Sequence, residues 1–394
     1  MMSELKTIAD IQTGPFGSQL HKEDYVQNGT PIVTVEHLGN RVFTEQNLPM
    51  VSDADKERLN KYVLSEGDIV FSRVGSVDRC SYVDSNHSGW MFSGRCLRVR
   101  PYNAIYPLYL YYFFCMESTK QFVRNIAVGA TMPSINTKLM GEIEVSVPSI
   151  DTQKRIAAIL STIDDKIELN TAINENLEQQ MQAFFIELFI KNAKPEWKTG
   201  TISDLGNVIG GGTPSKKVEE YYTNDGIAWI TPKDLSNDKS KFIAHGETDI
   251  TDLGLAKSSA TLMPRGAVLF SSRAPIGYID IADGQVSTNQ GFKSIVPFIN
   301  VGTAYIYYFL KENLSAIENV ASGSTFKEVS GSTMKNFPAV IPDDDTLAEF
   351  KQFCSPLFER LRTLEYENRY LASIRDTLLP KLMNGEIDVS AVKI

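Results

Sequence analysis

The chain is poor in cysteine and histidine, with four residues of each among 394. The cysteines are scattered and form no CxxC pair, and no histidine lies at zinc-ligand spacing from them. We therefore expect no zinc site and no disulfide framework. All four cysteines are expected to be reduced thiols of the core: Cys80, Cys96, Cys115 and Cys354.

Long apolar runs are also missing. No stretch of about eighteen uncharged apolar residues occurs, and the N-terminal MMSELKTIAD has no basic segment followed by an apolar one. We expect neither a membrane span nor a secretory signal, and hence a cytoplasmic protein. The formal net charge of -9 argues against a uniformly basic nucleic-acid binder but leaves room for local basic patches.

Signatures of common enzyme sites are absent too. GGGTPSKK at 210–217 has glycines but not the spacing of a P-loop or a dinucleotide fingerprint, and HExxH, GxSxG and methyltransferase motifs are missing. In PDDDTLAEFK, residues Asp343, Glu349 and Lys351 resemble elements of a metal-dependent nuclease, but the short spacing and a predicted helix start favour capping. We predict no catalytic residue, and no metal or cofactor bound by this chain.

The sequence contains an internal repeat. TIADI at Thr7 recurs as TISDL at Thr201, EGDIVFSRVG as RGAVLFSSRAPIG, and YLYYFF at Tyr109 as YIYYFL at Tyr305, with an offset between 194 and 199 throughout. Gly14 of TGPFGS matches Gly211 of GGGTPS at an offset of 197. The protein is therefore two copies of one unit.

Each copy combines a globule with a long helix. The globules, 1–148 and 195–342, alternate short β-rich runs with Gly and Pro turns around one aromatic-rich helix, so a mixed α/β fold is expected. The aromatic segments at 109–114 and 305–309 are expected to be core. The helical segments, 149–194 and 343–394, carry apolar residues at heptad spacing, which predicts two helices that pack against each other.

The predicted seams are in matching register. They comprise Ile156, Leu160, Ile163, Ile167, Asn174, Leu177 and Met181 in the first copy, and Leu357, Leu361, Leu364, Asn368, Leu371 and Leu378 in the second. Asn174 and Asn368 fall at equivalent positions, either as a register-setting polar pair or as a wetter part of the seam. Thr346 and Glu349 fit a capping box. Pro356 and Pro380 predict a second helix that is kinked or begins late.

Polar and basic residues in the turns of both copies are candidates for contacts with DNA. Arg, Lys, Asn and Gln can pair with base edges, while Ser, Thr and Lys can hold phosphates. Arg73 and Arg273 occupy nearly the same place after matching β-runs. The full candidate set is Thr13, Ser18, Arg73, Arg79, Thr131, Thr213, Ser215, Lys216, Lys217, Lys233, Arg273, Asn289, Gln290, Lys293, Thr325 and Lys327.

The order of several strings resembles one known family. GGGTPS, VSTNQGFKSIVP, FSGRCLRVRP, VPSIDTQKRIAAIL and LLPKLMNGEIDVS, within a duplicated globule and helix, are similar to the specificity subunit of type I restriction-modification systems. The resemblance spans essentially the whole chain. It implies an α+β fold in which two α/β target-recognition globules, related by a pseudo-twofold axis, are separated by two long antiparallel coiled-coil helices.

The resemblance also implies a function. Each globule would read one half of a bipartite site in double-stranded DNA, with the helices setting the gap, and two methyltransferase subunits and then restriction (translocase) subunits would dock on the chain. S-adenosylmethionine, ATP and Mg²⁺ would belong to those partners. Two alternatives remain open from the residues alone: a coiled-coil scaffold that binds protein without DNA specificity, and a standalone nuclease that depends on Glu349.

Overall fold

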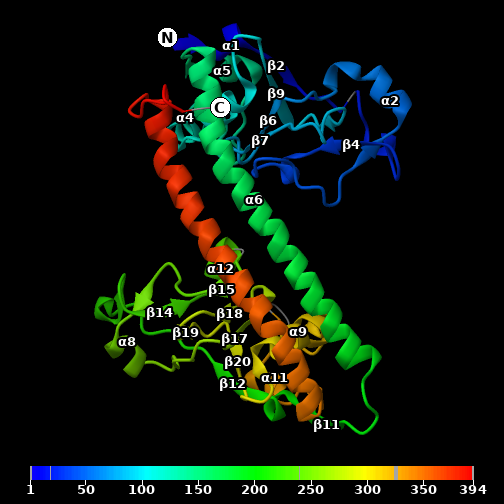
Figure 1. Ribbon diagram of the computed structural model, residues 1–394, viewed down its shortest axis with the longest axis vertical. Coiled ribbons are helices and arrows are strands. Elements are labelled where there is room, and N and C mark those ends of the chain that lie inside the picture. Colours follow the sequence, from blue (N-terminus) through cyan, green and yellow to red (C-terminus); the bar gives the residue numbers. More distant parts are fainter. Residues whose placement is uncertain (1, 18, 239, 324–326, 393–394) are drawn as a thin grey trace. The chain divides into compact units, whose positions relative to one another are not determined.

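The computed structural model describes residues 2–17, 19–238, 240–323 and 327–392. The chain forms two compact units, which can be followed by colour in Figure 1. The first unit is Met1–Glu168 with Tyr370–Ile394, and the second is Leu169–Arg369. Each long helix therefore contributes to both units. The ranges 1–148, 149–194, 195–342 and 343–394 divide the chain by its repeat and remain a sequence-based prediction.

The globule of the first unit contains three small sheets. An antiparallel sheet has the order β2-β9-β6-β7, a second has the order β3-β5-β4-β8 with β4 and β8 parallel, and β1 pairs with β10. The strands are β1 (Met2–Glu4), β2 (Ala9–Thr13), β3 (Tyr25–Val26), β4 (Thr30–Val33), β5 (Met50–Val51), β6 (Ile69–Ser72), β7 (Cys80–Tyr82), β8 (Met91–Phe92), β9 (Cys96–Pro101) and β10 (Glu144–Ser146). The short helices are α1 (Leu5–Ile8), α2 (Asp53–Arg58), α3 (Pro107–Cys115), α4 (Glu117–Ile126) and α5 (Thr137–Gly141).

The globule of the second unit repeats this topology. Its sheets have the orders β12-β20-β17-β18-β15 and β13-β16-β14-β19, and β11 pairs with β21. The strands are β11 (Lys198–Thr201), β12 (Gly206–Gly210), β13 (Tyr222–Thr223), β14 (Ile227–Ile230), β15 (Phe242–Ile243), β16 (Asp249–Ile250), β17 (Val268–Ser272), β18 (Ile276–Ala282), β19 (Val286–Thr288), β20 (Lys293–Pro297) and β21 (Pro338–Ile341). The helices are α7 (Pro232–Asn237), α8 (Asp252–Ala256), α9 (Gly302–Glu312), α10 (Leu314–Asn319) and α11 (Gly331–Lys335). The predicted repeat and mixed α/β globules are confirmed.

Aromatic helices lie at the centre of both cores, as predicted. Tyr109 and Tyr112 of α3, and Tyr308 of α9, are among the largest fully buried side chains. The cysteines are free; Cys80, Cys96 and Cys354 are buried, and Cys115 is half-buried. Burial raises the pKa of the Cys96 thiol to about 11 and that of Cys354 to about 12, so both stay neutral in the core.

The long helices are α6 (Ile150–Ile186), which ends in a π-helical turn at Glu187–Lys191, and α12 (Asp344–Met383). Their segments are antiparallel within each unit. In the first unit, Arg375 Nη1 lies 2.8 Å from Asp164 Oδ1. In the second, Asn170 Nδ2 donates to Asn368 Oδ1 over 2.9 Å, so Asn170 takes the place expected for Asn174, whose buried Oδ1 has no hydrogen-bond partner among the described residues. Every predicted seam residue is buried or half-buried.

Helix α12 differs from its prediction at its start, while the kinks expected at Pro356 and Pro380 remain a prediction. Asp343, not Thr346, is the capping residue, since its Oδ1 accepts the backbone N–H of Thr346 over 2.9 Å. The expectation of a late start is wrong, because the helix begins at Asp344 and runs through Pro356 and Pro380. A proline inside a helix costs about 3 kcal/mol. Each fully buried large side chain around Pro356 offsets roughly 1.5–3 kcal/mol, and Phe350, Cys354, Phe358 and Leu361 are all buried there.

Candidate nucleic-acid interface

One loop of each globule is held so closely that only glycine fits. After β12, a β-carbon added to Gly211 would lie 1.8 Å from the carbonyl oxygen of Asn289. After β2, a β-carbon on Gly14 would lie 2.1 Å from the carbonyl oxygen of Ser93. Real β-carbons do not approach carbonyl oxygens so closely, so any larger residue would push the two loops apart. The glycine match at an offset of 197 therefore reflects the same loop contact in both copies.

In the second unit this loop borders a hollow of about 480 Å³. Its lining comes from β14, the loop after β12, the start of α7, the loops after β17 and β19, and Glu247 and Thr248 before β16. The lining includes six predicted candidates together, which are Thr213, Lys216, Lys233, Arg273, Asn289 and Gln290. Trp229 forms part of the wall, and its indole Nε1 donates to the carbonyl oxygen of Gly212 over 2.9 Å. This hydrogen bond holds the wall of the hollow to the loop after β12.

The cations at the hollow differ in how they are paired. Lys233 Nζ lies 2.5 Å from Glu247 Oε2, and Arg273 Nη1 lies 3.8 Å from Glu328 Oε2. Lys216 is exposed and forms no ion pair among the described residues. An exposed, unpaired ammonium is available to a phosphate at a lower desolvation cost than a paired one.

Polar groups of the hollow can present hydrogen bonds to a ligand. Gln290 is exposed, and its Oε1 accepts a hydrogen bond from the hydroxyl of Thr213. The carboxamide nitrogen of Gln290 remains a donor, and carboxamides pair bidentately with adenine. Asn289 has a structural role as well, because its Oδ1 accepts the backbone N–H of Gly291 over 2.8 Å.

The equivalent loop of the first unit displays different chemistry. Phe16 occupies the repeat position of Thr213, and its side chain is 53% exposed. The guanidinium carbon of Arg73 lies 5.4 Å from the centre of the Phe16 ring, a cation–π geometry. Arg73 Nη1 also donates to the carbonyl oxygen of Gly94 over 3.0 Å. Sequence reasoning missed Phe16, although an aromatic residue in a Gly/Pro turn is the signal that marks it.

The remaining candidates are less closely grouped. Lys293 is mostly buried, with Nζ 3.3 Å from Glu328 Oε1. Arg79 donates to the carbonyl oxygen of Leu38, and Thr13 is the half-buried last residue of β2. Four candidates are exposed but do not line the hollow: Thr131, Ser215, Lys217 and Lys327. Two, Ser18 and Thr325, lie outside the described residues.

The two arginines that follow the matching strands are one position apart in the structural register. The backbone N–H of Ile135 donates to the carbonyl oxygen of Arg73 over 3.0 Å, and that of Val329 donates to Ser272 over the same distance. Arg73 therefore matches Ser272, and Arg273 matches Val74. The offset is 199 from Ile69 to Arg73, so the extra serine of FSSR places Arg273 one position later.

Comparison with known proteins decides the family. The family model described as the type I restriction modification DNA specificity domain matches residues 1–179 and 194–363. The chain belongs to this family. Each of the two matched segments contains one globule, so the specificity domain is present twice.

Relatives within the family are named as specificity subunits. The MjaIX specificity subunit of Methanocaldococcus jannaschii is 36% identical over 192 residues, which are 48% of this chain and 44% of that protein. The HindI specificity subunit of Haemophilus influenzae is 25% identical over 442 aligned positions, covering 91% of this chain and 95% of the relative. A solved S subunit from M. genitalium has a TM-score of 0.58 at 14% identity, with 97% of this chain and 95% of that chain covered. This specificity-family chain shares its fold.

The described part of the chain has neither a cluster of metal ligands nor a membrane-spanning helix. No group of three or more His, Cys, Asp or Glu side chains there is arranged to hold a metal ion. Among the same residues, no helix of the chain is both long and apolar enough to cross a bilayer.

Proposed function

We propose that this chain is the DNA-recognition subunit of a cytoplasmic type I restriction-modification complex. The proposal rests on the loops after β2 and β12. In both, a glycine lies so close to a backbone carbonyl oxygen that no side chain fits, while the exposed side chains of the two loops differ. A rigid loop with variable side chains is suited to reading base edges, because base contacts need fixed geometry while specificity needs different donors and acceptors. In this proposal each globule reads its own half of a bipartite site.

The long helices would set the gap between the half-sites. A helix rises 1.5 Å per residue, so removing about one turn, four residues, from both α6 and α12 should shorten the preferred gap. Methyltransferase and restriction subunits would dock on this chain and supply the chemistry. S-adenosylmethionine, ATP and Mg²⁺ are proposed to bind those subunits, and this chain to carry no catalytic residue of its own.

A mobility shift tests the proposal directly. The chain, purified with its methyltransferase subunit, is mixed with a library of random duplexes at several salt concentrations, and the bound fraction is sequenced. We expect enrichment of two short motifs at a fixed separation, with an affinity that falls as salt rises. Absence of any sequence preference at every salt concentration would favour a protein-binding scaffold. Cleavage with Mg²⁺ by the chain alone, lost in Glu349→Ala, would indicate a nuclease.

A further inference from the structure

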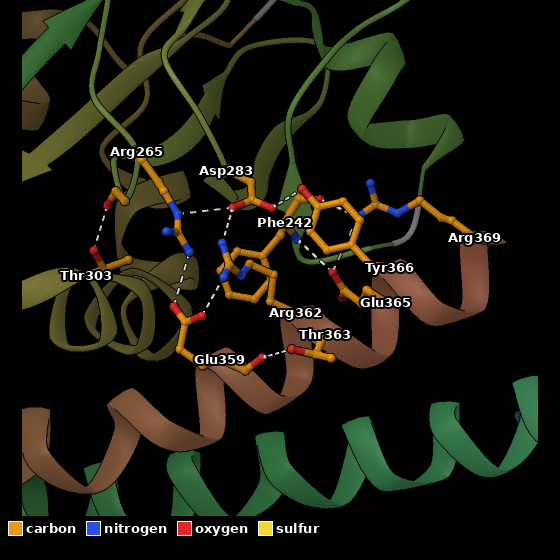
Figure 2. A network of polar contacts seen from close by, with 11 residues as sticks. Phe242, Arg265, Asp283, Thr303, Glu359, Arg362, Thr363, Glu365, Tyr366 and Arg369 are labelled. Carbon is orange, nitrogen blue, oxygen red and sulfur yellow. Dashed lines mark hydrogen bonds and ion pairs between the residues drawn. The ribbon is translucent and has the colours of Figure 1, made fainter.

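In the second unit, a buried carboxylate joins the globule to α12. Asp283 follows β18, and its side chain is only 1% exposed. Its Oδ1 lies 3.1 Å from Arg362 Nη1 and 3.2 Å from Arg265 Nε, while its Oδ2 accepts the Tyr366 hydroxyl over 2.7 Å. Figure 2 shows Arg362 and Tyr366 reaching from the helix to Asp283. Arg265, also of the globule, has its Nη2 3.1 Å from Glu359 Oε1 of α12. The globule thus presents Asp283 to Arg362 and Arg265 to Glu359.

Residues on the same face of α12 also form hydrogen bonds with the edge strand β15 of the five-stranded sheet. Glu365 accepts the backbone N–H groups of Lys241 and Phe242 over 2.7 and 3.1 Å, and Arg369 donates to the carbonyl oxygen of Phe242 over 3.0 Å (Figure 2). Burial raises the pKa of the Glu365 carboxyl. These contacts fix the sheet against the helix and place Asp283 opposite Arg362.

In the first unit the charge pair at one position of the junction is reversed. Arg41 of the globule reaches α6, where its Nε donates to Glu168 Oε1 over 2.8 Å and its Nη2 lies 2.5 Å from Asp165 Oδ1. The Arg41 side chain is 16% exposed. This globule therefore presents a positive charge to a negative helix face.

The reversal occurs at equivalent positions of the two helices. In the seam register of 194, Glu168 corresponds to Arg362, and Asp165 corresponds to Glu359. Asp165 and Glu359 are both acidic and do not distinguish the helices. Glu168 and Arg362 carry opposite charges and do. A globule docked on the wrong helix would bring Asp283 against Glu168, or Arg41 against Arg362. Asp283 would keep Arg265 but would meet a like charge in place of Arg362. A buried charge that meets a like charge in place of a partner is destabilising.

We propose that the opposite charges of Glu168 and Arg362 match each globule to its own helix. The two globules share one fold and the same close glycine contact. During folding, repeated domains can assemble with the wrong neighbour. A junction that tolerates only one of the two globules prevents this error. The inference concerns assembly of the chain and does not rest on DNA recognition.

The test compares two full-length chains, the native chain and one in which residues 1–148 and 195–342 are transposed. Each is prepared with and without the pair Glu168→Arg and Arg362→Glu, which leaves the net charge unchanged. In the native order, the pair should lower the urea midpoint of unfolding by on the order of 1 M. In the transposed chain the same pair should raise the midpoint. A general effect on helix stability would shift both chains in one direction, and that outcome would overturn the proposal.

The chain offers a matched control on the same helices. Glu175→Arg with Arg360→Glu makes the same charge changes at exposed positions that form no ion pair among the described residues, and it should leave both midpoints nearly unchanged. If the transposed chain does not fold, the native chain still decides the question. There Arg41→Glu should recover at least half of the midpoint lost in Glu168→Arg, and no recovery would contradict the proposal.

Discussion

The loops after β2 and β12 share a backbone contact but differ in the groups they expose. In the second unit, Thr213 and Gln290 form a polar pair beside Lys216. In the first, Phe16 and Gly94 occupy the corresponding positions, and Arg73 lies against the aromatic ring. Conservation of the frame with exchange of its side chains shows how one duplicated fold can hold two different binding chemistries.

The arginines that follow β6 and β17 differ in whether a carboxylate pairs with them. Arg73 forms no ion pair among the described residues, and its guanidinium contacts the Phe16 ring and the carbonyl oxygen of Gly94. Arg273 shares Glu328 with Lys293. A cation held by a carboxylate must leave it to meet a phosphate, so the two globules are expected to depend differently on salt.

The largest expected effect comes from the glycines that the loops share. Gly211→Ala and Gly14→Ala each place a β-carbon on a backbone oxygen, and we expect each to cost about 2–4 kcal/mol of unfolding free energy, as severe local overpacking does. Urea unfolding measures this loss. Gly210→Ala and Gly17→Ala are the matched controls, because an added β-carbon there meets nothing within 4 Å. Equal losses in all four variants would show that the close backbone contacts of Gly14 and Gly211 are not the cause of the loss.

The next effect is confined to the second globule. Changing Thr213, Ser215 and Lys216 together to Ala removes two hydroxyls and one unpaired cation, and should weaken specific DNA binding by roughly thirtyfold while reducing the salt slope by about one. Affinity is measured with the methyltransferase complex, and complex formation by size exclusion is the control. Normal affinity would reduce GGGTPS to a structural turn.

A smaller effect is expected from Phe16 in the first globule. Phe16→Ala should weaken binding by about tenfold, the effect of losing one stacking contact with a base, with little change in the salt slope because no charge is lost. Phe16→Trp should retain binding. A uniform loss for all sequences, accompanied by a reduced salt slope, would show that the ring acts only by holding Arg73.

The smallest expected effect concerns the residues that cap the N-termini of α6 and α12, which differ in charge. Lys194 Nζ, the backbone N–H of Thr346 and Trp197 Nε1 hold the pKa of Asp343 below its usual range, whereas Ser149 caps α6 with a hydroxyl. A lowered carboxyl pKa contributes stability that is present above the unfolded pKa of about 3.9 and is lost as pH falls towards the folded value. Acidification should therefore reduce hydrogen-exchange protection in the first turn of α12 before that of α6, and Asp343→Asn should abolish the difference. Equal loss at both helix starts would contradict this.

Periodic features could be predicted from the sequence, and features that depend on long-range contacts could not. The repeat, the aromatic cores and the seams follow from spacing alone. The contact of Arg41 with Glu168 joins residues 127 positions apart, and no local pattern marks it. The displacement of Arg273 by one position follows from the extra serine of FSSR, which the sequence itself contains. The continuity of α12 through Pro356, by contrast, depends on the burial around it. The hollow was not predicted, although six of its lining residues were candidates, because its walls come from separate loops.

The most direct test of the central claim, that each globule reads its own half-site, is sequencing of methylated DNA from cells that carry the native chain, the Thr213/Ser215/Lys216 triple variant, or no copy of the gene. We predict two different short motifs at a fixed separation in the native cells and none in the cells without the gene. The triple variant should relax the motif read by the second globule and leave the other motif and the gap unchanged. Relaxation of both motifs together, or methylation unaffected by loss of the gene, would contradict the account.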